Sequence, residues 1–255
     1  MDRKLDPVGV FDSGVGGISA LREMRRVLPS ETFIYFGDIR NAPYGTKSTD
    51  EVIGYARAVV KELLDQKIKA LVIACNTATG AAAATLRREL TIPVIGMEPA
   101  LKPASEVRKN GRILVLATPL TLHQEKFNRL MEKYGEGAER VPCNGLMELV
   151  ENEDFDGAEQ YLRELFAGLD MEHVDAVVLG CTHYVFLKDM IRDMIPDRIA
   201  ITEGSEGTAR QLRRVLQKNE LLNEQGEGRV ILQTSGTEKD ILLMRKLLET
   251  DKMGR

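Results

Sequence analysis

The sequence predicts an α/β protein of two similar parallel-sheet domains related by pseudo-symmetry, with the active site in the cleft between them. Short apolar runs of strand length alternate with segments of helical periodicity, as in parallel sheets with right-handed crossovers. Two runs also look like copies of each other, ALVIACNT at 70–77 and AVVLGCTH at 176–183. Their cysteines lie 106 residues apart (181 minus 75), which is about the length of one small domain.

The first domain is predicted to comprise residues 1–97 together with 209–255. Its elements are expected, in order, as strand 8–11, helix 18–28, strand 32–36, helix 52–64, strand 70–75, helix 77–90 and strand 93–96. In each helix the apolar residues recur every three or four positions, which is typical of one buried face. The chain is expected to return to this domain through helix 209–215, surface connection 222–228, strand 230–234 and helix 241–248.

The second domain is predicted at 98–208. Its elements are expected as strand 113–117, strand 141–143, helix 156–169, strand 176–181, helix 185–195 and strand 199–202. The acidic run 148–154 is expected to form a solvated face. Cys143, next to Pro142, is expected to be structural.

Composition excludes several classes of function. The 35 basic and 39 acidic residues are well mixed and give a net charge of −4, so no basic face for nucleic acid is indicated. The amino terminus has no signal-peptide core and no run reaches membrane-spanning length, which predicts a cytoplasmic protein without a membrane partner. The three cysteines are widely spaced without a CxxC pair, which favours free thiols over disulfides.

Cys75 and Cys181 each end a predicted buried strand. Ligands of open α/β sheets bind at the carboxyl ends of the strands, where the free N–H groups of a following helix favour a thiolate or a bound carboxylate. A single cysteine there is often a small apolar core residue. Core packing, however, does not require the hydrogen-bonding residues that follow each cysteine at 76–77 and 182–183. The pair therefore predicts an anionic substrate held between two thiols.

Two opposed thiols suit the inversion of a stereocentre, which needs a base on one face of the carbon and an acid on the other. Asp12, after the first strand, and His183, two residues after Cys181, are expected to assist. The loop 41–46 fits an ordinary surface turn, which the sequence alone favours, and also a fixed loop that presents the Tyr44 ring and backbone amides to a ligand. Neutral hydroxyls, amides and helix N-termini are expected to hold the substrate carboxylates, and the side chains concerned are Ser13, Asn76, Thr77, Thr118, Thr121 and Thr182.

Taken together, the motifs VFDSGVGG, YFGD with APYG, ACNTA and LGCTHY resemble those of the glutamate racemases, in the aspartate/glutamate racemase superfamily. The resemblance covers most of the chain. It implies a cofactor-independent isomerase without metal that interconverts L- and D-glutamate and supplies D-glutamate for peptidoglycan. Homodimers are frequent in the family, so a homodimer with glutamate as its small-molecule substrate is expected.

The same resemblance assigns roles to residues. Cys75 is implied as the base for D-glutamate and Cys181 as the base for L-glutamate, with assistance from Asp12 and His183. It also implies a set of substrate-binding residues, namely Ser13, Tyr44, Gly45, Asn76, Thr77, Thr182 and His183. Glu151 matches a family glutamate near the cleft. The chain departs from the family pattern at Leu120, Glu148 and Gly204, where relatives commonly have glycine, proline and serine.

Three other interpretations remain open at this stage. Cys75, Cys181 and His183 are possible zinc ligands, although only three are present and without close spacing. The same fold is also compatible with an amino-acid sensor that performs no chemistry. Finally, a racemase for aspartate or a hydantoin would use the same thiols.

Overall fold

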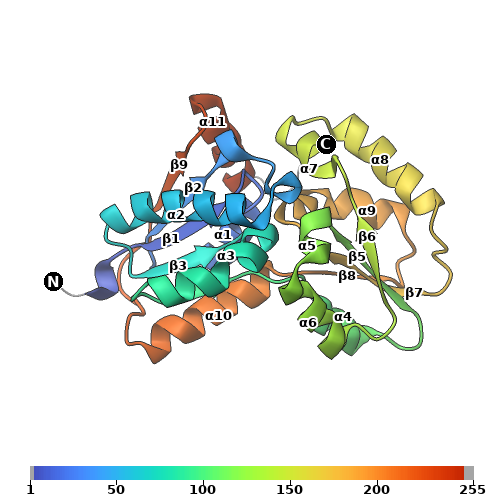
Figure 1. Cartoon of the computed structure of the whole chain (residues 1–255), viewed down its shortest axis with the longest axis horizontal. Coiled ribbons are helices and arrows are strands. Elements are labelled where there is room, and N and C mark those ends of the chain that lie inside the picture. The colour runs from blue at the N-terminus through green and yellow to red at the C-terminus, as the bar shows by residue number, and fades with distance from the viewer. Residues whose placement is uncertain (1–2, 250–255) are drawn as a thin grey trace.

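The computed structural model describes residues 3–249, which form two parallel β-sheets flanked by helices (Figure 1). The first sheet has five strands in the order β4-β3-β1-β2-β9. Their bounds are β1 Val8–Asp12, β2 Phe33–Gly37, β3 Ala70–Ile73, β4 Val94–Gly96 and β9 Val230–Thr234. Every pairing between neighbouring strands is parallel. All the carboxyl ends of the strands therefore lie at one edge of this sheet.

The second sheet repeats the topology of the first. Its order is β6-β5-β7-β8, with β5 Arg112–Ala117, β6 Ala138–Pro142, β7 Val174–Leu179 and β8 Ala200–Glu203. In each sheet the first strand has the second on one side and the third on the other, so β1 corresponds to β5 and β3 to β7. The predicted fold class, two similar parallel-sheet α/β units, is confirmed.

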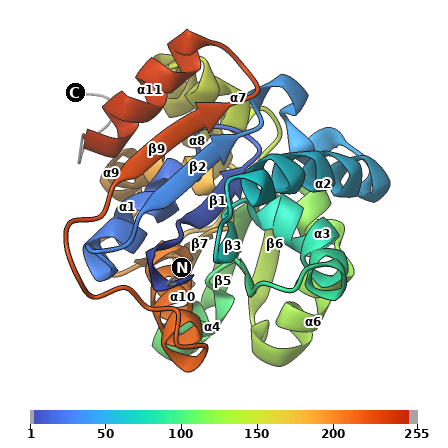
Figure 2. The ribbon, with the colours of Figure 1, turned by 90° about the vertical axis from the view of Figure 1, so that its left-hand side faces the viewer.

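The helices follow the strands in the alternation that the sequence predicts. Their bounds are α1 Ile18–Val27, α2 Thr49–Asp65, α3 Asn76–Glu89, α4 Leu101–Val107, α5 Pro119–His123, α6 Glu125–Tyr134, α7 Leu146–Glu151, α8 Phe155–Ala167, α9 Lys188–Met194, α10 Ser205–Lys218 and α11 Glu238–Glu249. Short 3-10 helices lie at η1 Arg3–Leu5, η2 Ile39–Asn41, η3 Tyr44–Thr46 and η4 Thr182–Leu187. Figure 2 shows α1 and α11 on one side of the first sheet and α2 and α3 on the other.

Both faces of the first sheet are buried, because successive strand residues point to opposite faces. Val10 and Tyr35 pack with α1, whereas Phe11 and Phe36 pack with α2 and α3. The core on the α1 side continues into the second half and includes Leu116 and other residues of β5, β7 and α7 to α9. This shared core brings the carboxyl ends of β1 and β7 towards each other.

The structure corrects three expectations. The acidic run 148–154 is a solvated face only in part, because Asn152, Glu153 and Asp154 are exposed whereas α7 buries Val150 and directs Glu151 towards His183. The segment after Cys181 begins as a 3-10 helix, and the α-helix starts only at Lys188. Helices α4 to α7 have no counterpart among the predicted elements. Three of these four have seven residues or fewer, too short to show a helical period.

Strands of the first sheet come from residues 8–96 and 230–234, and those of the second from 112–203. The division into domains at 1–97 with 209–255 and at 98–208 stays a prediction, and its ends at 1–2 and 250–255 lie outside the described residues. None of the helices within residues 3–249 has both the length and the apolar character needed to cross a bilayer.

Candidate active site

Two cysteines occupy equivalent places in the two halves of the molecule. Cys75 lies two residues beyond the end of β3, and Cys181 lies two residues beyond the end of β7. Both are almost completely buried, and both are free thiols. The repeat seen in the sequence is therefore a structural repeat at the topological switch point of each sheet, where α/β proteins bind ligands.

Asp12, the last residue of β1, is fully buried between the two halves. Its Oδ1 accepts from Gly14 N at 3.0 Å and from Ser13 Oγ at 3.4 Å. Its Oδ2 accepts from Thr182 Oγ1 of the second half at 3.1 Å. Burial raises the pKa of the Asp12 carboxyl above its usual range, and the charge of Glu151 acts in the same direction.

The Cys75 sulfur caps helix α3. It accepts from Ala78 N at 3.4 Å and lies 3.5 Å from Ser13 Oγ. Burial, together with the charge of Asp12, raises the pKa of Cys75 to about 12, although the hydrogen bonds from Ala78 and Ser13 lower it. The expectation that the helix N-terminus favours a thiolate is therefore wrong for Cys75, because burial outweighs the helix. At neutral pH the raised pKa of Cys75 favours the thiol form.

Cys181 has a different partner. Its sulfur lies 3.6 Å from His183 Nδ1, and His183 Nε2 lies 2.6 Å from Glu151 Oε1. His183 is fully buried. Burial alone would lower the pKa of His183, but the hydrogen bonds to Cys181 and Glu151 and their charges raise it well above its usual range. Cys181 therefore lies beside an imidazole whose pKa is raised, whereas Cys75 lies near the buried carboxyl of Asp12.

Glu151 also joins the two halves. Its Oε1 accepts from Val15 N, in the turn after β1, at 2.9 Å. In the same region Ser19 Oγ donates to the carbonyl oxygen of Thr182 at 3.3 Å. The glycine-rich turn after β1 lies directly against the second half, since a Cβ at Gly16 would come within 2.6 Å of the His183 ring.

Three threonine hydroxyls from both halves form a cluster beside Cys75. Thr77 Oγ1 lies 3.0 Å from Thr118 Oγ1 and 2.9 Å from Thr121 Oγ1, and Thr118 Oγ1 donates to Thr121 Oγ1 at 2.9 Å. Gln124 Nε2 fixes the same turn by donating to the carbonyl of Thr77 at 2.9 Å. The neighbouring Asn76 Oδ1 is buried without a hydrogen-bond partner among the described residues, so it can accept from a ligand.

The loop with Tyr44 and Gly45 also contacts the second half, because a Cβ at Gly45 would lie 2.8 Å from Thr118 Cβ. The Tyr44 side chain is buried, and its hydroxyl donates to Asp38 Oδ2 at 2.6 Å. The hydroxyl is thus already engaged, so any contact of this loop with a ligand falls to its backbone. Asp38 was not among the predicted site residues, although it follows β2 just as Cys75 follows β3.

Every residue predicted for the site lies at the carboxyl ends of strands or in the segments that face them. Hydrogen bonds or close contacts connect these residues into one region spanning both halves, comprising Asp12, Ser13, Tyr44, Gly45, Cys75, Asn76, Thr77, Thr118, Thr121, Glu151, Cys181, Thr182 and His183. Sequence reasoning missed Gln124, for which no pattern gave a signal. Cys143 is buried, and its thiol donates to the carbonyl of Val141 at 3.5 Å.

The cysteines and His183 do not converge as metal ligands. Within residues 3–249, the only three histidine, cysteine or acidic side chains with ligand atoms all within 4.8 Å of one another are Asp170, Glu172 and His173. All three are exposed and lie just before β7, whereas Cys181 follows the other end of that strand. The geometry therefore does not support the zinc interpretation of Cys75, Cys181 and His183.

Comparison with known families decides where the chain belongs. The family described as Asp/Glu/Hydantoin racemase matches residues 16–218. The chain belongs to this family. A curated relative, the glutamate racemase of Clostridium acetobutylicum, is 48% identical, and the match covers 98% of this chain and all of the relative. The resemblance to glutamate racemases that the motifs indicate is confirmed, as is the prediction that the chain is a racemase.

Solved structures of this racemase family share the whole fold. A glutamate racemase isoform from Bacillus anthracis superposes with a TM-score of 0.88 at 33% identity, covering 98% of this chain and 96% of that one. The glutamate racemase of Francisella tularensis, solved with D-glutamate, gives a TM-score of 0.82 at 28% identity, with 98% and 95% covered. The two-sheet architecture is thus common to this chain and to these two solved members of the family.

Proposed function

We propose that this chain is a glutamate racemase that interconverts L- and D-glutamate by two-base proton transfer between Cys75 and Cys181. The observation that carries the proposal is the pair of thiols at equivalent strand ends of the two halves. One has a buried carboxylate as its neighbour and the other a histidine. Relatives named glutamate racemase, and one solved with D-glutamate, support glutamate as the substrate.

The reaction follows from the two environments. With L-glutamate, Cys181 as thiolate takes the α-proton, and the electron pair of the broken C–H bond remains on the α-carbon. The Cys75 thiol then donates its proton to the opposite face, which leaves Cys75 as thiolate and Cys181 as thiol. D-glutamate reacts through the same steps in reverse, and neither direction uses a cofactor or a metal ion.

The charges around the two thiols suit these starting roles. Burial and the charge of Asp12 keep a proton on Cys75. The raised pKa of His183 favours a protonated imidazole, whose Nδ1 lies 3.6 Å from the sulfur of Cys181, the thiol that takes the α-proton of L-glutamate. Glu151, bonded to the far side of the ring at 2.6 Å, orients the imidazole and holds its charge.

Neutral groups hold the substrate carboxylates in this proposal. The hydroxyls of Ser13, Thr77, Thr118, Thr121 and Thr182 and the amide of Asn76 come from both halves. The Asn76 amide can donate to a carboxylate oxygen, and its carbonyl oxygen can accept from the substrate ammonium group. The hydroxyls donate to the carboxylates by exchanging their present hydrogen bonds to Asp12 and to one another for bonds to the substrate. Tyr44 and Gly45 contribute through their backbone. A substrate held this way needs both halves together, which places the α-carbon between the thiols.

The D-glutamate product would have a use in cell-wall synthesis. D-glutamate made in the cytoplasm would enter peptidoglycan, so the enzyme would serve cell-wall synthesis. A homodimer is the expected assembly.

Proton NMR of L- and D-glutamate incubated in D2O with chelator-treated protein tests the proposal. We expect the α-proton signal to disappear from both isomers and the optical rotation to decay to zero. If the α-proton of aspartate or of a hydantoin exchanges and that of glutamate does not, glutamate is not the substrate. If glutamate binds but its α-proton does not exchange with solvent, the protein is an amino-acid sensor and not an enzyme.

A further inference from the structure

Ser235 lies just past the end of β9, the edge strand of the first sheet, and its hydroxyl makes two hydrogen bonds. Ser235 Oγ donates to Asp38 Oδ1 at 2.7 Å, across 197 residues of sequence. The same oxygen accepts from Arg40 N at 3.0 Å. One side chain from the end of the chain therefore fixes both the carboxylate and the backbone of the segment that follows β2.

Asp38 passes this constraint to the loop predicted to bind substrate. Its carboxylate accepts from Tyr44 Oη at 2.6 Å and from Asn41 Nδ2 at 3.0 and 3.1 Å. Asp38 is almost fully buried, and each hydrogen bond to its carboxylate from the described residues comes from a neutral donor. The orientation of this buried carboxylate therefore depends on all three of these side chains.

The loop itself has little tolerance for movement. Tyr44 is buried, and the close contact of Gly45 with Thr118 places the loop against the second half. A shift of the Asp38 carboxylate therefore moves the Tyr44 hydroxyl and, with it, the backbone that faces the substrate.

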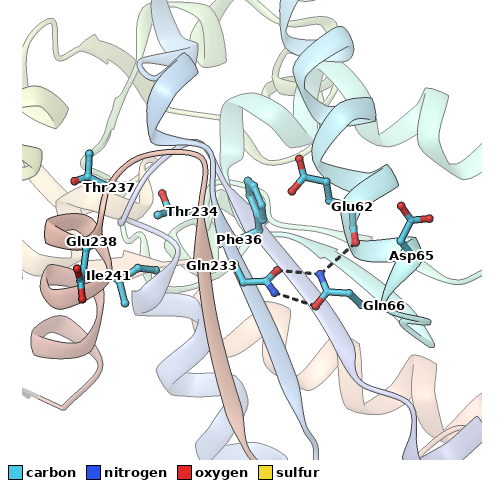
Figure 3. Close-up of a pocket in the computed structure, with 9 residues that line it drawn as sticks. All are labelled: Phe36, Glu62, Asp65, Gln66, Gln233, Thr234, Thr237, Glu238 and Ile241. Atoms are coloured by element: carbon cyan, nitrogen blue, oxygen red, sulfur yellow. Dashed lines mark hydrogen bonds between the residues drawn. The ribbon is translucent and has the colours of Figure 1, made fainter.

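The segment with Ser235 follows strand residues that border a pocket. This pocket of about 690 Å³ lies beside the end of β9. Figure 3 shows the residues that line it, which include Gln233, Thr234 and Thr237. No predicted substrate-binding residue lines it. The segment is held on its inner side, where Ser235 N and Thr234 Oγ1 donate to the carbonyl of Gly37 at 3.1 and 2.8 Å. Among the hydrogen bonds on the inner side, the one from the Ser235 hydroxyl is made to the carboxylate of Asp38.

We propose that Ser235 is a positioning residue for substrate binding: through Asp38 it holds the Tyr44–Gly45 loop in the conformation that faces the substrate. This inference rests on the proposed racemase function. Ser235 makes no hydrogen bond to Ser13, the partner of Cys75, or to His183, the partner of Cys181. Loss of its hydroxyl therefore weakens substrate binding and leaves proton transfer intact. The consequence is a change in KM with little change in kcat.

The test compares Ser235→Ala with Ser235→Thr and Thr237→Ala in glutamate racemisation. Thr237→Ala is the matched control, because its hydroxyl donates to Asp240 at the start of α11 and not to Asp38. We expect Ser235→Ala to raise KM for both isomers about tenfold, equivalent to about 1.4 kcal/mol, with kcat within about twofold. Ser235→Thr, which keeps the hydroxyl, and Thr237→Ala are expected to retain the wild-type KM.

Asn41→Ala removes another donor to Asp38 without altering β9, and it should raise KM in the same way. An active wild type whose KM is unchanged in Ser235→Ala, or is raised equally by Thr237→Ala, overturns this inference alone. A Ser235→Ala variant that loses kcat and keeps KM also overturns it. A wild type that racemises no glutamate overturns the proposed function and this inference together.

Discussion

Thr182 donates its hydroxyl to Asp12 at 3.1 Å, although 170 residues separate them and they belong to different halves of the molecule. Two further hydrogen bonds join the two halves in the same region, from Val15 N to Glu151 and from Ser19 Oγ to the Thr182 carbonyl. The turn after β1 is therefore both part of the candidate site and the contact between halves. A change in how the halves meet must alter the geometry around both thiols.

Substitution of Gly16 tests this coupling. A Cβ there would lie 2.4 Å from His183 Nδ1 and 2.5 Å from Thr182 Oγ1, and both side chains are buried. Gly16→Ala must push the halves apart or displace the histidine. We expect kcat/KM for glutamate to fall about 10²-fold, with a loss of unfolding free energy of about 1–3 kcal/mol.

Gly54 provides the matched control. It lies in the interior of helix α2, and a Cβ there meets nothing within 4 Å. Gly54→Ala should keep wild-type activity and add about 0.5–1 kcal/mol of stability, because alanine favours the helix. A Gly16→Ala enzyme with wild-type kcat/KM would show that the contact between the halves does not set the site geometry.

The two-base proposal predicts equal losses in both directions. Cys75→Ala and Cys181→Ala each remove one of the two groups that every turnover requires, so each should lower kcat by about 10²–10⁴-fold with L- and with D-glutamate. Initial rates from each pure isomer, followed by circular dichroism, measure this. Retention of more than about a tenth of the wild-type rate by either variant contradicts its role.

Cys143→Ala is the control for cysteine removal. Its thiol contacts only the carbonyl of Val141 among the hydrogen bonds of the described residues, and burial raises its pKa to about 12. This variant should racemise glutamate at the wild-type rate. A loss as large as that of Cys75→Ala would mean that thiol removal disturbs the fold and not the chemistry.

Part of the candidate site could be predicted from the sequence, because ligands of α/β proteins bind at the carboxyl ends of parallel strands. Asp12, Cys75 and Cys181 each follow an apolar run that can only be a buried strand, and parallel strands bring such residues to one edge. His183 was found because it lies two residues from Cys181. These positions depend on local pattern, which the sequence shows directly.

The contacts between distant segments could not be predicted in this way. The acidic run predicts a solvated face, yet α7 turns Glu151 inward, and this helix is too short for its period to be recognised. Only the family resemblance indicated Glu151. The bond between Asp38 and Ser235 spans 197 residues and depends on where β9 pairs in the sheet. Such pairings follow from tertiary packing, which no local pattern records.

Asp12→Asn should stabilise the protein while it reduces activity. The raised pKa of Asp12, due first to burial, means that the folded protein favours the neutral carboxyl. This cost is present at neutral pH and disappears as the pH falls through the folded pKa towards the unfolded value near 3.8. We expect the variant to melt about 2–4 °C above wild type at pH 7.5 for each kcal/mol gained.

The gain should shrink in melts at lower pH, because the wild-type carboxyl then gains its own proton. Glutamate racemisation by Asp12→Asn should fall about 10²-fold, as expected for loss of an assisting group. A variant that melts below wild type at pH 7.5 would mean that the charge of Asp12 stabilises the fold.

Lys69 and Glu31 form a buried ion pair whose loss should be the most destabilising of these changes. Lys69 Nζ lies 2.5 Å from Glu31 Oε2, and both side chains are at most 1% exposed. Glu31 Oε1 also accepts from Asn223 N at 2.8 Å, which ties the segment before β9 to the core. Lys69→Met leaves the Glu31 charge buried and unpaired, so we expect a loss of about 3–5 kcal/mol in urea denaturation.

Removing both charges should recover most of this loss, because a buried pair replaced by apolar side chains is often neutral or stabilising. The double variant Lys69→Met with Glu31→Leu is therefore expected to have a urea midpoint close to that of wild type. Arg57→Met, which breaks the exposed pair with Glu89, should leave the midpoint unchanged. A Lys69→Met midpoint equal to that of Arg57→Met would show that solvent reaches Glu31.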